Sequence, residues 1–471
     1  MVNQLLLDNF RQQPTQQQFE AFEKLAQFIE NRGPQDCFVL KGYAGTGKTS
    51  IIGALTKTLP YLRMRSVLLA PTGRAAKVIS LYSKREAYTI HKKIYRKKVA
   101  ASIDLDFDLA ENLHTNTLFI IDEASMIANE SISFFSSGIL DDLVKYVESG
   151  ENCNLLFIGD SAQLPPVGLY ESPALQPSYL ESNYGLRVTA HELTQVVRQD
   201  LQSGILWNAT SIRQQINLDD PEAQHPFPKL RTSGFNDVYK MTGEKLIDGI
   251  NYAYDNFGQE NSIVICRSNR AANLYNQHIR NTILFRDEEI TGGDQIMINK
   301  NNYYWLQQEN PEDKRFIANG DLAVVKRVSN IHQEHGFRFA DLEMELQDMD
   351  DARITCRVLL DSLHVDAPSL PQESMKELYS SIELDYADIK DRKERLSAIK
   401  ADPYYNALQI KFAYAITCHK AQGGEWPIVF IDQGYINEDM LNTEFLRWLY
   451  TAVTRAKTQL FLVNFHEEFY Q

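Results

Sequence analysis

One eight-residue segment limits the possible folds of this chain more than any other. Residues 42–49 read GYAGTGKT and match the pattern G-x-x-x-x-G-K-S/T in full. They follow an apolar run at residues 37–40, which predicts a buried strand, and they precede a predicted helix. The glycines let the backbone curl so that its N–H groups face phosphates, while Lys48 neutralises the β- and γ-phosphates and Thr49 binds Mg²⁺. We therefore expect an α/β fold that binds a nucleoside triphosphate and Mg²⁺ at this turn.

Further apolar runs of strand length recur along the chain, and each ends in a polar or glycine-containing turn. They lie at residues 67–70, 118–121, 155–159, 262–266, 428–431 and 460–463. Apolar strands that alternate with helices are typical of parallel sheets covered on both faces, so the pattern predicts two α/β cores. Between about 295 and 410, β-like segments followed by a charged helical stretch predict an insertion of small β-barrel type plus helices.

Composition argues against several classes of protein. The 471 residues include 48 Lys and Arg against 62 Asp and Glu, which gives a net charge of −14. This charge argues against a protein that coats duplex DNA, whereas a local basic groove on an acidic body is compatible with it. The five cysteines are odd in number and far apart, which indicates a reducing, cytoplasmic compartment. No apolar run approaches the roughly 20 residues of a membrane span, so we expect no contact with a membrane.

Two more strand ends carry groups suited to phosphate chemistry. In LFIIDE, residues 118–123, an apolar strand ends in two carboxylates. We assign Asp122 to the metal ion and Glu123 to the general base that polarises the attacking water. In GDSAQLPPV, residues 159–167, we expect Gln163 to sense the γ-phosphate and to orient that water. A solvated strand end and a capped proline-rich loop are the alternatives.

Two arginines are candidates for neutralising charge in the transition state. Arg455 ends a predicted helix in LYTAVTRAK, residues 449–457, and Arg198 lies in LTQVVRQ, residues 193–199. An arginine that reaches the γ-phosphate from a second lobe couples lobe closure to hydrolysis. A single arginine is more often a surface ion-pair partner, so both assignments depend on the surrounding motifs.

The order of these segments along the chain resembles that of a known family. The segments are Gln18, GYAGTGKT, LLAPTGRAAK, TIHK, IIDEAS, GDSAQLPPVG, LTQVVRQ, AITCHKAQGGEW and LYTAVTRAK. Together they are similar to the motifs of the superfamily 1B DNA helicases of the RecD-like and Dda-like group, which are P-loop NTPases. The resemblance covers about residues 15–200, 260–290 and 411–465.

The resemblance implies a two-lobed architecture. We expect two RecA-like parallel-sheet lobes, with a small hairpin insertion in the first and an SH3-like β-barrel plus a helical insertion in the second. The implied boundaries are 1–80 and 117–200 for the first lobe, 81–116 for a basic segment and the hairpin, 201–294 and 411–471 for the second lobe, and 295–410 for the barrel and helices.

The resemblance also implies an activity. The chain would be an ATP-dependent DNA helicase, with Mg²⁺ as cofactor, that moves 5′→3′ on single-stranded DNA and unwinds duplexes in repair or recombination. Its partners would be single-stranded DNA, junctions of single and double strands, and single-strand-binding or replication and repair proteins, and it would act as a monomer. Two alternatives remain open: an ATP-driven translocase on RNA, and a nucleotide-dependent switch protein without unwinding.

The family's nucleotide contacts map onto particular residues of this chain. The adenine contact falls on Gln18 and the ribose contact on Glu425. Because residues 16–18 are all glutamine, the register is ambiguous, and the start of an amphipathic helix is the alternative. The remaining implied contacts are Gly42, Gly45, Thr46, Gly47, Lys48, Thr49 and Gly423.

The implied nucleic-acid contacts lie on loops at the other edge of the sheets. They are Pro71, Thr72, Arg74, Thr89, His91, Lys92, Thr417 and His419. Such side chains would hold phosphate oxygens without reading sequence. Basic residues between 84 and 98 are interleaved with Tyr88 and Tyr95, which independently predicts a single-strand channel or, alternatively, a solvated helix face. The family uses a hairpin at 97–116 to separate strands, but here that segment is acidic and would repel phosphates, which leaves its role open.

Overall fold

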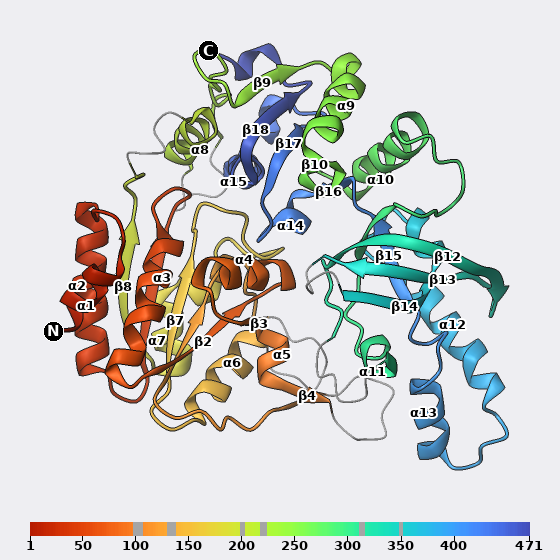
Figure 1. The fold of residues 1–471 in the computed structure, drawn as a ribbon, viewed down its shortest axis with the longest axis horizontal. Coiled ribbons are helices and arrows are strands. Elements are labelled where there is room, and N and C mark those ends of the chain that lie inside the picture. Colours follow the sequence, from red (N-terminus) through yellow and green to blue (C-terminus); the bar gives the residue numbers. More distant parts are fainter. Residues whose placement is uncertain (98–106, 130–137, 198–202, 217–223, 310–315, 348–351) are drawn as a thin grey trace.

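Two parallel sheets and a closed barrel make up the fold (Figure 1). The computed structural model describes residues 1–97, 107–129, 138–197, 203–216, 224–309, 316–347 and 352–471. In the part of the chain so described, no helix is long and apolar enough to cross a membrane. The two α/β lobes predicted from the apolar runs, and the barrel inserted in the second, are confirmed.

The first lobe is built on a six-stranded parallel sheet with the order β3-β2-β6-β7-β1-β8. Its strands are β1 (Asp36–Gly42), β2 (Arg65–Ala70), β3 (Ala87–Thr89), β6 (Thr117–Ile121), β7 (Asn154–Gly159) and β8 (Arg187–Leu193). Its helices are α1 (Val2–Asn9), α2 (Gln16–Asn31), α3 (Lys48–Thr58), α4 (Gly73–Ser83), α5 (Ile90–Ile94), α6 (Ile139–Glu148) and α7 (Pro177–Tyr184).

Alternation along the strands explains why helices cover both faces of this sheet. In β1, Phe38 and Leu40 pack in one cluster with α1, α2 and α3, whereas Cys37 and Val39 pack in another with α6 and α7. Both sets are apolar because side chains of a strand alternate between two faces and both faces are buried here. The apolar stripe of α2 begins after a capping box formed by Thr15 and Gln18.

The second lobe has a five-stranded parallel sheet with the order β16-β10-β17-β18-β9. Its strands are β9 (Val238–Met241), β10 (Ser262–Cys266), β16 (Ala415–Thr417), β17 (Trp426–Asp432) and β18 (Ala456–Val463). One face packs on α9 (Leu246–Phe257) and α10 (Asn269–His278), and the other on α8 (Gly204–Gln215), α14 (Cys418–Ala421) and α15 (Thr443–Val453).

The helical insertion lies in a connection between two strands of the closed barrel. The barrel closes through β11 (Gln295–Ile298), β12 (Leu322–Glu334), β13 (Phe337–Leu346), β14 (Ala352–Leu359) and β15 (Leu408–Phe412). Strands β14 and β15 pair in parallel, and a parallel pair requires a long crossover. That crossover carries α12 (Gln372–Asp385) and α13 (Arg392–Lys400), which extend away from the barrel, while α11 (Trp305–Glu309) lies between β11 and β12 (Figure 1).

Two domain boundaries in the structure differ from those expected from the sequence. The segment 81–116 was expected to lie wholly outside the first lobe, but β3 pairs with β2 and completes the edge of the lobe's sheet. Among the described residues of this segment, β4 (Tyr95–Lys97) and β5 (Phe107–Leu109) pair as an antiparallel hairpin, and residues 98–106 lie outside the described residues. The barrel extends to Phe412 rather than to residue 410, because β15 pairs with β11 up to that residue.

Candidate functional site

A cavity of about 550 Å³ lies where the predicted phosphate-binding and catalytic segments meet, and we call it the phosphate-loop cavity. Strands β1, β6 and β7 are neighbours in one parallel sheet, so the turns that follow their carboxyl ends share one edge. The second lobe closes the opposite side. The predicted residues that line it are Gly45, Gly47, Lys48, Thr49, Asp122, Glu123, Gln163, Glu425 and Arg455.

The phosphate loop has the backbone that its glycines predict. Gly45 and Gly47 adopt φ angles of 74° and 87°, in the left-handed region where other residues are strained. Helix α3 begins at Lys48, so the free N–H groups of its first turn face the cavity. Lys48 Nζ donates to the carbonyls of Gly42 (2.6 Å) and Tyr43 (3.0 Å), which holds the ammonium group over the loop.

The side chain of Gln18, on α2, forms a hydrogen bond with the phosphate loop. Its Oε1 accepts from the N–H of Thr15 (2.9 Å), and its Nε2 donates to the carbonyl of Thr46 (2.9 Å). Gln18 is 2% exposed, and a Cβ added to Gly47 would lie 2.4 Å from its Nε2. Gln18 therefore lies at the start of a helix, which was the alternative interpretation of residues 16–18. Its contact with adenine stays a prediction. From the same segment, Gln12 lines the cavity.

Asp122 and Glu123 form a buried pair of carboxylates. Burial is the main cause that raises the pKa of each, and the charge of Glu123 adds to the effect on Asp122. Arg455 and Lys48 oppose the rise at Glu123. Glu123 also adopts a left-handed backbone with φ 52°, a strained conformation of the kind found at functional sites. The pair suits a general base near neutral pH and a divalent cation alongside it.

The donors in this cavity fit Mg²⁺. Thr49 and Asp122 line the same cavity and supply a hydroxyl and a carboxylate oxygen, the hard ligands that this ion prefers alongside phosphate oxygens. Within the described ranges no group of three or more His, Cys, Asp or Glu side chains is arranged to hold a metal.

The sensor and arginine candidates are placed on opposite lobes. The Oε1 of Gln163 is buried and accepts no hydrogen bond from any described residue, so it is available to a water molecule. Arg455 is 4% exposed and donates to Thr451 O (3.0 Å), Gly424 O (3.1 Å) and Thr454 Oγ1 (3.1 Å). Arg198, the other arginine expected to act here, lies outside the described residues.

Two of the remaining nucleotide candidates contact other protein groups. Glu425 pairs with Lys457 Nζ at 2.7 Å at the cavity. Gly423 has φ 72° and lies against α4, where an added Cβ would be 2.9 Å from the Cβ of Ala75. Gly423 therefore allows the second lobe to approach the first, and its contact with nucleotide stays a prediction.

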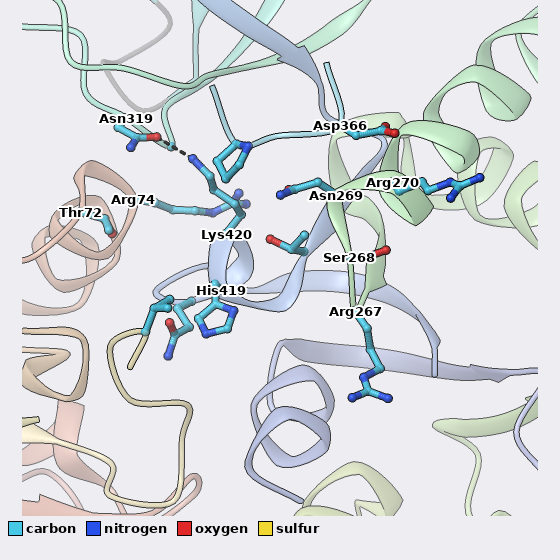
Figure 2. A pocket seen from close by; sticks show the side chains of 15 residues that line it. Thr72, Arg74, Arg267, Ser268, Asn269, Arg270, Asn319, Asp366, His419 and Lys420 are labelled. Atoms are coloured by element: carbon cyan, nitrogen blue, oxygen red, sulfur yellow. Dashed lines mark hydrogen bonds between the residues drawn. The ribbon is translucent and has the colours of Figure 1, made fainter. Parts of the chain in front are cut away.

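A second cavity, of about 650 Å³, lies among both lobes and the barrel, and we call it the barrel-side cavity. Figure 2 shows Thr72 and Arg74 on the first lobe facing His419 and Lys420 of α14 across it. Four of the eight predicted nucleic-acid contacts line it: Thr72, Arg74, Thr417 and His419. The structure thus brings segments separated by about 345 residues to one site.

The other four predicted contacts lie along the adjoining strand ends. Thr89 ends β3 and pairs in register with Ala70 of β2, the residue before Pro71. The Thr89 hydroxyl accepts from the N–H of Lys92 (3.2 Å), and His91 lies on the same short helix. Lys92 of this segment lies beside an aromatic ring, with its Nζ 5.1 Å from the ring centroid of Tyr88.

Several cavity residues were not predicted from the sequence. Residues 267–270, RSNR, follow the carboxyl end of β10, and the same strand-then-polar signal that found other motifs would have found them. Lys420 lies inside a motif already identified. Asn319 comes from the barrel, and its Oδ1 accepts from Lys420 Nζ at 2.6 Å (Figure 2). No local signal marks Asn319, because its role depends on how the barrel packs.

The charge of the barrel-side cavity comes from arginine and lysine rather than histidine. Desolvation lowers the pKa of both His91 and His419, so these imidazoles are neutral hydrogen-bonding groups near pH 7. Burial also lowers the pKa of Lys420, to about 8. The Arg74 guanidinium lies 3.8 Å from the ring centroid of Trp426, which joins the two lobes at the edge of this cavity.

Two family models match this chain, one on each lobe. The AAA domain model matches residues 13–223, and the UvrD-like helicase C-terminal domain model matches residues 412–463. An uncharacterized protein of Acanthamoeba polyphaga mimivirus is 25% identical over 95% of this chain and 98% of its own length. The ATP-dependent DNA helicase dda of Enterobacteria phage T4 is 22% identical over 90% of this chain and 93% of its own length. The chain is thus similar to the P-loop helicases of superfamily 1B.

The motifs of this helicase fall within the matched segments. The AAA match contains the phosphate loop, the carboxylate pair and Gln163, and the C-terminal match contains α14, α15 and Arg455. Among solved structures, the helicase is similar to the Pif1 helicase from Bacteroides in complex with ADP-AlF3 and ssDNA. That match has 14% identity and a TM-score of 0.46, and it covers 95% of this chain and 94% of the other.

Proposed function

We propose that this chain is an ATP-dependent DNA helicase that moves 5′→3′ on single-stranded DNA and unwinds the duplex ahead of it. One observation carries the coupling between the two activities. Residues 417–425 run directly from the barrel-side cavity, lined by Thr417 and His419, to the phosphate-loop cavity, lined by Glu425. A shift of this segment on the DNA side is therefore transmitted to the nucleotide side within nine residues.

The residues of the phosphate-loop cavity support in-line hydrolysis of ATP. Glu123 would take a proton from a water molecule as the water oxygen attacks the γ-phosphorus and the bond to the bridging oxygen of ADP breaks. Gln163 would orient that water, and Arg455 and Lys48 would neutralise charge on the transferred group. Mg²⁺, held by Thr49, Asp122 and the phosphates, would supply further neutralisation.

The barrel-side cavity supports contact with the backbone of a single strand. Its polar and cationic side chains come from both lobes and from the barrel, and phosphate contacts of this kind carry no sequence information. We add Arg267, Arg270 and Lys420 to the proposed contacts. A strand held by both lobes advances when the lobes move relative to each other.

The proposal includes a monomer in a reducing, cytoplasmic compartment. One chain supplies both lobes of each cavity, so a second copy is not needed to complete either site. All five cysteines are buried and unpaired, as suits reducing conditions. Analytical ultracentrifugation with and without oligo-dT tests the monomer.

Steady-state ATP hydrolysis with and without oligo-dT tests the function. We expect oligo-dT to raise kcat at least about tenfold, oligo-rU to raise it less, and 5′-tailed duplexes to be unwound in preference to 3′-tailed ones. A preference for oligo-rU would favour the RNA translocase, and stimulation without unwinding of either duplex would leave a translocase only. Hydrolysis that is indifferent to both polymers would contradict a nucleic-acid motor.

DNA affinity is expected to fall as the pH rises above the pKa of Lys420. That pKa is about 8 in the structure, and a nearby phosphate would raise it in the complex. The electrostatic gain is then complete below about pH 8 and is lost as the pH rises toward the higher pKa of the complex. Fluorescence anisotropy with labelled oligo-dT at constant ionic strength measures this. Lys420→Arg is the control, because guanidinium stays charged, and identical pH profiles for the two proteins would contradict the assignment.

A further inference from the structure

Helix α15 of the second lobe holds the loop of the first lobe that carries Gln163. The guanidinium of Arg447 on α15 is 5% exposed and donates to three carbonyls of this loop, those of Ser161, Gln163 and Tyr170. One turn further along the helix, Thr451 Oγ1 accepts from the N–H of Leu164 at 2.8 Å. Backbone groups of the loop are therefore bonded to the second lobe, so the two must move together or exchange partners.

The hydroxyl of Tyr450 extends this connection to the phosphate loop. It donates to Asp160 Oδ2 at 2.7 Å and accepts from the N–H of Ala44 at 2.9 Å. Asp160 Oδ1 in turn accepts from the N–H of Ala162, in the turn that leads to Gln163. Tyr450 is 1% exposed, and burial raises the pKa of its phenol well above the ordinary value, so the hydroxyl keeps its proton. One buried group thus joins three segments.

Helix α15 also contacts a residue that lines the barrel-side cavity. Arg267 lines that cavity, and its Cζ lies 5.5 Å from the ring centroid of Phe445 and 5.8 Å from that of Trp448, both on α15. Cys418 Sγ at the start of α14 contacts the carbonyl of Trp448. At its other end α15 leads to Arg455, whose Nε donates to Thr451 O. The helix therefore contacts residues that line each of the two cavities.

We propose that Tyr450 is a positioning residue through which the second lobe, and with it bound DNA, sets the phosphate loop and Gln163 for hydrolysis. This inference rests on the proposed function. The positioning role requires a side chain that donates to Asp160 and accepts from the N–H of Ala44 at the same time. A phenol does both, and a phenyl ring does neither. Tyr450 acts through these neighbours and does not itself touch the reacting atoms.

The test compares Tyr450→Phe with Tyr275→Phe. Tyr275 is a matched control, because its hydroxyl also donates to a carboxylate, Asp432 Oδ2 at 2.9 Å, but within the second lobe. The readout is the ratio of kcat with saturating oligo-dT to kcat without it, with the KM for ATP measured alongside. We expect the ratio to fall about fivefold or more in Tyr450→Phe, and to stay within about twofold in Tyr275→Phe.

A second variant, Thr451→Val, tests the same connection independently of whether Tyr450→Phe folds. Thr451→Val keeps the side-chain shape and removes the acceptor for Leu164 N–H, so it should lower the same ratio. Thermal unfolding of each variant shows whether it folds. A purely structural role would scale both rates equally and leave the ratio unchanged.

The outcomes separate the inference from the proposed function. An unchanged ratio in Tyr450→Phe and Thr451→Val, against a wild type that DNA stimulates, overturns the inference alone. A wild type that DNA does not stimulate overturns the proposed function, and the inference with it. A lowered ratio in both variants, with the control unchanged, supports the coupling.

Discussion

Glu123→Gln is expected to lower the DNA-stimulated kcat by about 10³-fold, because loss of a general base typically costs 10²–10⁴-fold. Glutamine matches glutamate in size but does not accept a proton from the attacking water. Burial raises the pKa of Glu123, so wild-type kcat should also rise with pH in the acidic range as this carboxyl ionises. Steady-state hydrolysis at saturating ATP and oligo-dT, from about pH 5 to 8, measures both effects.

ATP binding should survive this substitution, since Glu123 acts on the water rather than on the nucleotide. Fluorescent ATP analogues should bind within about threefold of wild type. Glu260→Gln is the control, because Glu260 is exposed on the second lobe outside both cavities and should keep kcat within about twofold. A kcat of Glu123→Gln within about tenfold of wild type would assign the base to another group.

Arg455→Ala is expected to lower kcat by about 10³-fold, in keeping with the effect of an arginine that neutralises the transition state. The ammonium group of Arg455→Lys should recover only part of the rate, because it lacks the planar fork of a guanidinium. Guanidinium chloride at concentrations below those that unfold the protein should partly restore Arg455→Ala. Hydrolysis assays with saturating ATP measure these effects.

Folding must be checked for this variant because Arg455 is buried. Its guanidinium donates to Thr451 O, Gly424 O and Thr454 Oγ1, and the substitution removes these three hydrogen bonds from a buried site. Arg357→Ala is a matched control, since Arg357 pairs with Asp341 at 2.8 Å in the barrel, away from both cavities. It should lower stability while kcat stays within about twofold. A loss of kcat in Arg455→Ala that is no larger than in this control would show that Arg455 has a structural role and not a catalytic one.

Local patterns in the sequence were sufficient for the central strands of both sheets and for the turns that follow β1, β6 and β7 at the phosphate-loop cavity. An apolar run followed by a polar or glycine-rich turn encodes a buried parallel strand and its carboxyl end within about ten residues. The parallel sheets then place those ends at one edge, so Lys48, Glu123 and Gln163 meet without further information. Residues 267–270 follow β10 with the same pattern of an apolar strand and a polar turn.

Contacts between distant segments were decided by the tertiary structure alone. Asn319 meets Lys420 across 101 residues, and Tyr450 meets Ala44 across 406. The boundary at β3 and the buried hydrogen bonds of Gln18 likewise depend on which strand or loop lies alongside. A hydrogen bond of this kind depends on how lobes and barrel pack, and side-chain patterns along one segment carry no record of that packing. The sequence by itself determined which chemical groups this helicase has at its strand ends, and the packing of the lobes decided which of them act together.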